Sequence, residues 1–332
     1  MVRGRIAVSL PVESLSARLQ LKSRLTLGPA RCDSFFCMTD AFPHSRPISP
    51  GSRLAIVAPA GPFDPEAFEA GIEWLRTRYE VRFDESIYTR TGYHAGDDSR
   101  RLGELQAALQ DPAIDAILCA RGGYGVTRLL PGLSPETVAA TGKPLVGFSD
   151  ITALHALWAR AGLRSFHAEM VTGLGIASDA ERIAWAAALE GDAESIHWPV
   201  DTIVPGAARG RLTGGNLAVL VSLVGTSQEP PLDGTILFLE DVGERPYRID
   251  RMLTQLTQAG WFARCSGIAL GAFTEGDPGP DGVSIEQVFE ACFGSLEIPV
   301  ISGLPAGHIE GNKTLPFGAE AAISGNFLTI SN

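Results

Sequence analysis

The sequence lacks the features that mark membrane proteins and nucleic-acid binders. No apolar run approaches the ~18 residues that a membrane-spanning helix needs. The formal net charge is −11, and no basic cluster in the body of the chain offsets it. Because a polyanion would be repelled by such a protein, we expect no nucleic-acid partner, and we expect no membrane partner either.

Cysteine is scarce, and no pair of cysteines has CxxC spacing, so neither a disulfide framework nor a zinc site is indicated. The sequence also has no H-E-x-x-H motif and no EF-hand loop, and "HAGDD" (94–98) is more simply a turn that starts a helix. We therefore expect no metal, and reduced thiols in a cytoplasmic protein. The five cysteines are Cys32, Cys37, Cys119, Cys265 and Cys292.

The first 37 residues differ in composition from the rest, with six Lys or Arg against two acids. Their apolar stretch is short and is broken by Pro11, which argues against a secretory signal. We interpret residues 1–48 as a disordered extension, or as the product of too early a start codon with Met38 as the true start. An Arg- and Ser-rich transit peptide is the alternative. Ordered structure is expected from near Ser49.

Strands alternate with helices in the first half of the chain, which predicts an α/β domain with a parallel sheet. Sheets of this kind place their sites at the carboxyl ends of strands, where the turn "RGGYG" (121–125) and Ser149 both lie. The expected strands are 53–61, 79–87, 113–120 and 144–149, and the expected helices are 64–78, 96–111 and 150–162, the first of them capped by Asp64 and the second by Asp97, Asp98 or Ser99.

The pattern changes after about residue 176 and then returns to α/β. We predict an N-terminal domain over 49–185, a linker with short strands over 186–208, and a second α/β domain with a mixed sheet over 209–332. In the second domain the expected strands are 235–241, 265–273 and 298–308, followed by a closing hairpin in 317–332.

Ser149 stands where "PLVGFS" stops as a strand and "DITALHALWARAG" begins as a helix. A serine on such a turn exposes its hydroxyl, and the N–H of Asp150 then lies at a helix N-terminus, where an oxyanion is favoured. The alternative is that Ser149 or Asp150 only caps the helix. The glycines of "RGGYG" offer further backbone donors, although a tight turn explains them equally well.

A nucleophilic serine needs a base, and the chain has six histidines. His308 follows a strand among glycines and has the best setting, with His167 second. Glu240 ends the apolar strand "TILFLED" and would suit a histidine as partner, while the adjacent Asp241 should face the opposite side. The alternative partner for Glu240 is an arginine of 244–251. The other histidines are His44, His94, His155 and His197.

Five blocks in order resemble the LD-carboxypeptidases, a family of serine peptidases. They are "CARGGYGVTRLLP", "KPLVGFSDITALH", "GRLTGGNLAVLVSLVGT", "LFLEDVGERPYRIDRMLTQL" and "LPAGHIEGNKTLPFGAEA". The resemblance runs from about Arg53 to the C-terminus. It implies a flavodoxin- or amidotransferase-like N-terminal domain, a C-terminal α/β domain, and an active site in the cleft between them.

The resemblance also implies the roles of single residues. Ser149 falls on the family's nucleophile, Glu240 on its acid and His308 on its base, and the N–H groups of Gly123 and Asp150 fall on its oxyanion hole. The family is typically cytoplasmic and homodimeric, without metal or cofactor. Its activity implies release of the terminal D-Ala from murein tetrapeptide, at the bond after meso-diaminopimelate, in peptidoglycan recycling.

The substrate stays open at this stage, because "FHAEMVTG" (166–173) lies in a variable region. The alternative function is an amidase acting on peptidyl- or aminoacyl-nucleotides, as the microcin immunity members of the family do, and a non-catalytic binding protein on the same fold is a further alternative. A carboxypeptidase must also bind a carboxylate, for which arginine is the natural partner. The candidates are Arg121, Arg245 and Arg248.

Overall fold

The computed structural model describes residues 45–191 and 195–331. The predictions for residues 1–44, including a start at Met38, lie outside the described residues. Within these two ranges, no helix is long and apolar enough to cross a membrane.

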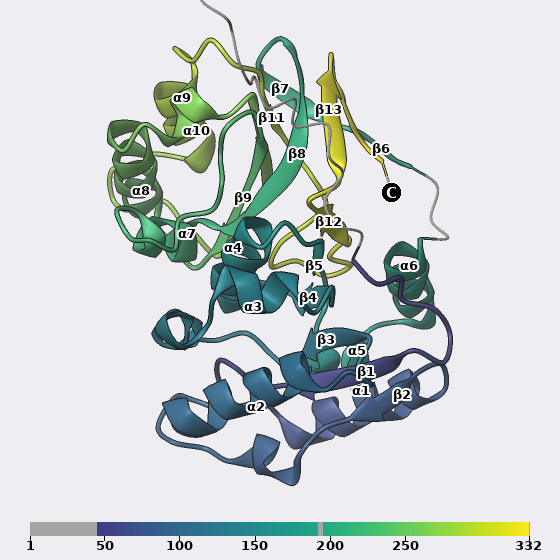
Figure 1. Ribbon diagram of the computed structural model, residues 1–332. Helices are drawn as coiled ribbons and strands as arrows, with labels where there is room; N and C mark the ends of the chain where they lie inside the picture. Colours follow the sequence, from purple (N-terminus) through teal and green to yellow (C-terminus); the bar gives the residue numbers. More distant parts are fainter. Residues whose placement is uncertain (1–44, 192–194, 332) are drawn as a thin grey trace, which may run out of the picture. The chain divides into compact units, whose positions relative to one another are not determined.

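The first sheet has six strands, and five of them run parallel as predicted. Strand β12, from the C-terminal part of the chain, pairs antiparallel with β5 and forms one edge (Figure 1). In spatial order the strands are β12 (Leu315–Phe317), β5 (Ser165–His167), β4 (Leu145–Gly147), β3 (Ala116–Cys119), β1 (Arg53–Val57) and β2 (Glu80–Arg82).

The helices of this half begin where the capping residues predict. Asp64 accepts hydrogen bonds from the first-turn N–H groups of α1, and Asp97 accepts from the Arg100 N–H at the start of α2. The helices are α1 (Pro65–Arg76), α2 (Asp98–Gln110), α3 (Pro135–Ala139), α4 (Thr152–Arg160), α5 (Val171–Ile176) and α6 (Asp179–Glu190). The short 3₁₀ helices are η1 (Glu85–Tyr88), η2 (Val126–Arg128), η3 (Leu130–Gly132) and η4 (Ser149–Ile151).

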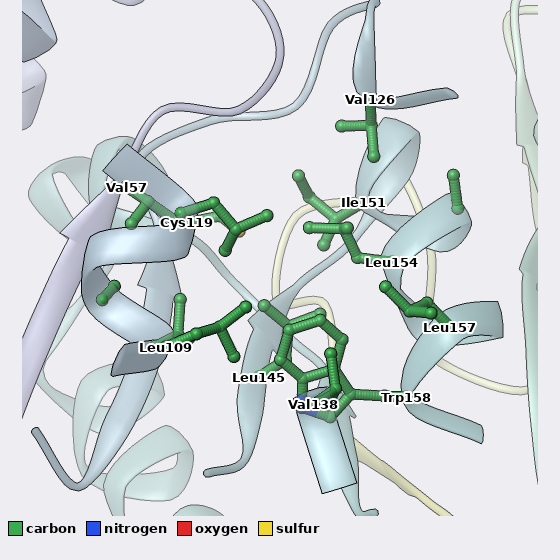
Figure 2. Close-up of a cluster of buried hydrophobic side chains, with 14 of the residues drawn as sticks. Val57, Leu109, Cys119, Val126, Val138, Leu145, Ile151, Leu154, Leu157 and Trp158 are labelled. Carbon is green, nitrogen blue, oxygen red and sulfur yellow. The ribbon is translucent and has the colours of Figure 1, made fainter. Parts of the chain in front are cut away.

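Apolar side chains cover both faces of this sheet, which explains why β1, β3 and β4 are nearly continuous apolar runs. On one face, residues of β1, β3 and β4 pack against α2 and α4, and Trp158 of α4 is part of this cluster (Figure 2). Ile151 belongs to this cluster and is fully buried. The core therefore anchors the chain two residues after Ser149. The opposite face is covered by α1, α5 and α6.

The second sheet has eight strands and is mixed, which confirms the predicted fold class. Its four central strands, β8 to β11, run parallel, and antiparallel strands flank them on both sides. In spatial order the strands are β6 (Ile196–Pro199), β14 (Phe327–Ile330), β13 (Glu320–Ser324), β8 (Ala207–Asn216), β9 (Ile236–Val242), β10 (Gly267–Thr274), β11 (Val300–Ser302) and β7 (Asp201–Val204).

Four helices pack on one face of the second sheet (Figure 1). Their apolar sides meet β9 and β10 in one cluster, and the opposite face of the sheet has a core of its own. The helices are α7 (Leu217–Leu223), α8 (Pro246–Gln258), α9 (Trp261–Arg264) and α10 (Ile285–Phe293).

The chain crosses between the two sheets more often than a simple succession of domains requires. Strands β6 and β7 lie within the stretch predicted as a linker and belong to the second sheet, while β12 leaves the second half to join the first sheet. The domain boundaries remain a prediction, but these crossings tie the two halves together. The N–H of Asn216, at the end of β8, also donates to Thr152 Oγ1 in α4 at 2.9 Å.

Candidate active site

Ser149 stands at a strained corner between β4 and α4. Its φ is +65°, in the left-handed region, and among the described non-glycine residues only Glu275 shares a positive φ. Holding a side-chain-bearing residue there costs of order 1–3 kcal/mol and is common at functional sites. Neither η4 nor α4 has a side-chain cap hydrogen bond, so Ser149 does not cap the helix and its hydroxyl is not used in that way.

The glycine turn after β3 lies directly against this corner. A Cβ on Gly122 would stand 2.8 Å from Ser149 Cβ and 2.9 Å from its Oγ, and a Cβ on Gly123 would meet the Gly61 Cα at 2.9 Å. Only glycine fits such close approaches. The Gly123 N–H has no acceptor among the hydrogen bonds of residues 45–191 and 195–331. A backbone donor is therefore free next to the serine.

Asp150 fastens the glycine turn to the corner. Its carboxylate accepts a hydrogen bond from the Val126 N–H at 2.9 Å. Burial raises the pKa of Asp150 to about 6, against the opposing effect of the backbone donors and of Arg101. The Asp150 side chain thus has a structural role. The group of this residue that was predicted to hold an oxyanion is its backbone N–H, in the first turn of η4.

Glu240 and His308 come from the second sheet and form the shortest contact of the site. Glu240 is near the end of β9 and is fully buried. Its Oε2 lies 2.7 Å from His308 Nδ1. Gly307 permits this approach, since a Cβ there would lie 3.0 Å from the same oxygen. The predicted opposite facing of Asp241 is confirmed, because its oxygens accept from Asn216 Nδ2 and the Ala218 N–H.

The pair is electrostatically coupled. Burial alone would raise the pKa of Glu240, but the imidazoles of His167 and His308 outweigh it and lower this pKa to about 2. Burial would lower the pKa of His308, but Glu240, Asp241 and Glu169 outweigh it and raise this pKa above 6.5. The alternative of an arginine partner for Glu240 is not observed, since Arg248 pairs with Glu244 instead.

His167 is a second histidine beside Glu240. Its Nε2 lies 4.0 Å from Glu240 Oε1, too far for a hydrogen bond, and both side chains are fully buried. Glu240 Oε1 and both ring nitrogens of His167 have no hydrogen-bond partner in the structure. The two best histidine candidates of the sequence therefore flank one carboxylate, and His308 is the one in direct contact with it.

The two halves of the site meet through Phe148. Its ring, next to Ser149 in the chain, lies 4.9 Å from the His308 ring. Between the described residues, no hydrogen bond joins Ser149 Oγ to His308. Catalytic hydrogen bonds of this kind often tighten only when substrate binds.

The remaining candidate residues lie in structural settings. His155 Nε2 donates to the Gly147 carbonyl, its Nδ1 contacts Ser165 Oγ, and burial lowers its pKa to about 3. The His94 ring packs against the rings of Tyr93 and Tyr124, with centroids 4.5 and 5.6 Å away.

His197 stacks on Phe327 at the surface, and His44 is outside the described residues. Of the arginines, Arg121 donates to the Pro62 carbonyl beside the glycine turn, whereas Arg245 is exposed at the start of α8.

A pocket of 840 Å³ opens beside His308. Its wall combines Phe148 and His308 with residues that the sequence analysis did not single out, above all Glu169, Asn312 and Lys313. Glu169 lies in the stretch 166–173, whose variability was the only signal for it. No group of three His, Cys, Asp or Glu within the described ranges is placed to hold a metal ion.

Comparison with known proteins identifies the family. Residues 54–168 match the LD-carboxypeptidase N-terminal domain, and residues 209–323 match the C-terminal domain. The murein tetrapeptide carboxypeptidase of Pseudomonas aeruginosa is 35% identical over 290 residues, which cover 83% of this chain and 94% of that protein.

Two solved structures extend the comparison. The muramoyltetrapeptide carboxypeptidase from Oxalobacter formigenes is 31% identical with a TM-score of 0.77, over 85% of this chain and 99% of that one. The microcin C7 self-immunity protein in complex with aspartyl sulfamoyl adenosine has a TM-score of 0.79 over 87% of this chain and 98% of that one, but at 22% identity this likeness shows the fold alone. With both halves matched and a relative above 30% identity, the chain belongs to the LD-carboxypeptidase family and is a serine-type carboxypeptidase.

Proposed function

We propose that this carboxypeptidase releases the terminal D-Ala from murein tetrapeptide by cleaving the bond after meso-diaminopimelate, as a step of peptidoglycan recycling. The observation that carries the proposal is the 2.7 Å contact between the buried Glu240 and His308, set beside a serine on a strained turn. The choice of substrate follows the names of two relatives, a murein tetrapeptide carboxypeptidase and a muramoyltetrapeptide carboxypeptidase.

Ser149 is the nucleophile of the proposed reaction. Its Oγ attacks the carbonyl carbon of the scissile amide while His308 Nε2 takes the hydroxyl proton. The negative charge that forms on the carbonyl oxygen is held by the N–H groups of Gly123 and Asp150, each worth about 3 kcal/mol by analogy with other acyl-transfer enzymes. Gly123 lies in the turn after β3, and Asp150 follows β4.

His308 transfers the proton, and Glu240 orients His308. Glu240 accepts the Nδ1–H of His308, which fixes the tautomer with Nε2 free as a base and stabilises the imidazolium. The C–N bond then breaks, and His308 returns the proton to the amine of the departing D-Ala. Water attacks the remaining ester with His308 again as base, which frees the peptide carboxylate and restores Ser149.

The proposal is tested by incubating the protein with L-Ala-γ-D-Glu-meso-diaminopimelate-D-Ala and following D-Ala by mass spectrometry. We expect release by the wild type and none by Ser149→Ala. Equal release by both proteins would contradict the assigned nucleophile. No release by the wild type would contradict the substrate.

A second candidate, an amidase for peptidyl- or aminoacyl-nucleotides, gains some support from the pocket. It needs an aromatic surface for a base, and Trp185 and Trp198 both line the pocket. The corresponding test offers an aminoacyl sulfamoyl adenosine in place of the tetrapeptide. Turnover of this compound, with no D-Ala release from tetrapeptide, would favour the second candidate.

The assembly and location complete the proposal. We infer a cytoplasmic homodimer, by analogy with the family. Sedimentation at micromolar concentration tests the dimer, and fractionation of cells that express the full chain tests the location. A monomer in the first, or a secreted protein in the second, would contradict this part of the proposal alone.

A further inference from the structure

Glu169 is the charged residue of the pocket whose role the reaction above does not use. It follows β5 by two residues and lines the 840 Å³ pocket together with His308 and Gly173. Its carboxylate packs closely against Gly173 of α5, because a Cβ at this glycine would overlap with Glu169 Oε2. The Glu169 carbonyl accepts a hydrogen bond from Trp185 Nε1 at 3.0 Å, which holds the backbone in place.

The other charged side chains of the pocket either form hydrogen bonds within the protein or are exposed to solvent. Glu181 Oε2 accepts from the Ser178 N–H and hydroxyl in a capping box, and these hydrogen bonds, with a smaller effect of the Lys313 charge, lower the pKa of Glu181. Glu310 and Lys313 are themselves exposed to solvent. Glu169 is half-buried, and no lysine or arginine of the described chain forms an ion pair with it.

A half-buried carboxylate that forms no ion pair can still bind a cation. Burial raises the pKa of Glu169, and the neighbouring Asn312 side chain, the Met170 backbone and the charge of His308 oppose this rise. Adding a cation at hydrogen-bond distance would recover the electrostatic cost of taking this carboxylate out of water. The group faces the same pocket as the base, so a substrate cation bound there would lie near the scissile bond.

We propose that Glu169 is a specificity-determining residue that binds a positively charged amine on the substrate, on the residue whose carbonyl is attacked. This inference rests on the proposed function and names the substrate class more closely: peptides whose penultimate residue carries a side-chain amine. An amine of this kind is present in meso-diaminopimelate and in lysine, and it is absent from norleucine, which has the same carbon chain as lysine.

The test measures binding separately from hydrolysis. In a Ser149→Ala background, calorimetry compares L-Ala-γ-D-Glu-L-Lys-D-Ala with the same peptide containing L-norleucine. We expect the lysine peptide to bind ~10-fold or more tightly, as charge-assisted hydrogen bonds imply. Adding Glu169→Gln should bring the ratio of the two Kd values close to one. Glu310→Gln removes an equal charge from the exposed rim of the same pocket and should keep the preference.

Several outcomes would overturn the inference. One is a parent protein that binds both peptides equally, or neither of them. Another is a preference for lysine that survives Glu169→Gln. A third is a Glu169→Gln enzyme, with Ser149 intact, that loses kcat/KM equally for both peptides, because this would show an effect through His308 rather than on the substrate amine.

The same variants separate this inference from the proposed function. If no peptide loses D-Ala but lysine-selective binding depends on Glu169, the proposed function fails and the inference stands. If D-Ala is released equally well from the lysine and norleucine peptides, the proposed reaction stands and the inference fails.

Discussion

The Ser149 corner and the Glu240–His308 pair are held by different physical effects. At the corner, the backbone is strained and the neighbouring glycines leave room for it, while the buried Ile151 anchors the chain. At the pair, an acid is fully buried and its charge is stabilised by imidazoles. The first region should therefore be sensitive to the size of a side chain, and the second to charge and pH.

The largest expected effect comes from substitutions that remove the nucleophile of the first region and the base of the second. Ser149→Ala and His308→Ala should each lower kcat by ~10⁴-fold or more, and the double variant should be hardly worse than either, because the residues act as a unit. D-Ala release by single and double variants measures this. Mild losses that multiply in the double variant would show that the two regions do not form one site.

The next largest effect is expected from a substitution that removes the negative charge of the second region alone. Glu240→Gln should lower kcat by about 10³–10⁴-fold, since the His308 tautomer is no longer fixed. The pKa of Glu240 is lowered from 4.5 to about 2 in the folded protein. Its carboxylate therefore stabilises the fold above pH 4.5, and this contribution is lost as the pH falls towards 2.

Acid unfolding checks this second prediction. The difference in free energy of unfolding between wild type and Glu240→Gln, measured with urea at several pH values, should shrink as the pH falls through this window. A difference that does not change with pH would mean that the charge of Glu240 is not stabilised by its histidine neighbours.

A smaller effect is expected from adding one methyl group in the first region. Gly122→Ala places a Cβ 2.8 Å from Ser149 Cβ, so the corner must shift, and misplacing a nucleophile by about 1 Å costs ~100-fold in rate. Gly103→Ala is the matched control, because that site has open space and an ordinary φ within α2. The control should keep full activity and gain up to about 1 kcal/mol in stability. Equal kcat values for both variants would contradict the claim that Gly122 is needed to position Ser149.

The smallest effect is a shift in pH dependence. The pKa of His308 is raised above 6.5 by its acidic neighbours, and the base must be neutral to accept a proton. The kcat/KM for D-Ala release should therefore rise with pH through an apparent pKa above 6.5. Glu240→Gln should move this limb to lower pH in its residual activity, whereas an unmoved limb would assign it to another group.

The sequence predicts the local parts of this architecture well. Asp64 and Asp97 mark the starts of two helices because side-chain caps act within one turn. The alternation of strands and helices predicts both α/β layers, and the alternation of side chains along β9 correctly separates Glu240 from Asp241.

The parts that depend on long-range packing are not predictable in this way. Nothing in "TLPFG" (314–318) indicates that β12 joins the first sheet, because an edge strand of three residues has no periodic pattern. The positive φ of Ser149 depends on packing at the corner between β4 and α4, and the place of His167 beside Glu240 arises only when the two halves meet. Glu169 shows its significance only through the pocket that surrounds it.

The central claim is that a serine from the first sheet is activated by a histidine and a glutamate from the second. The most direct measurement is labelling with a fluorophosphonate probe, followed by peptide mass spectrometry, in wild type, His308→Ala and Glu240→Gln. We expect the label on Ser149 in the wild type, with its rate reduced strongly by either substitution. Labelling of another residue, or labelling of Ser149 at an unchanged rate in both variants, would contradict the account.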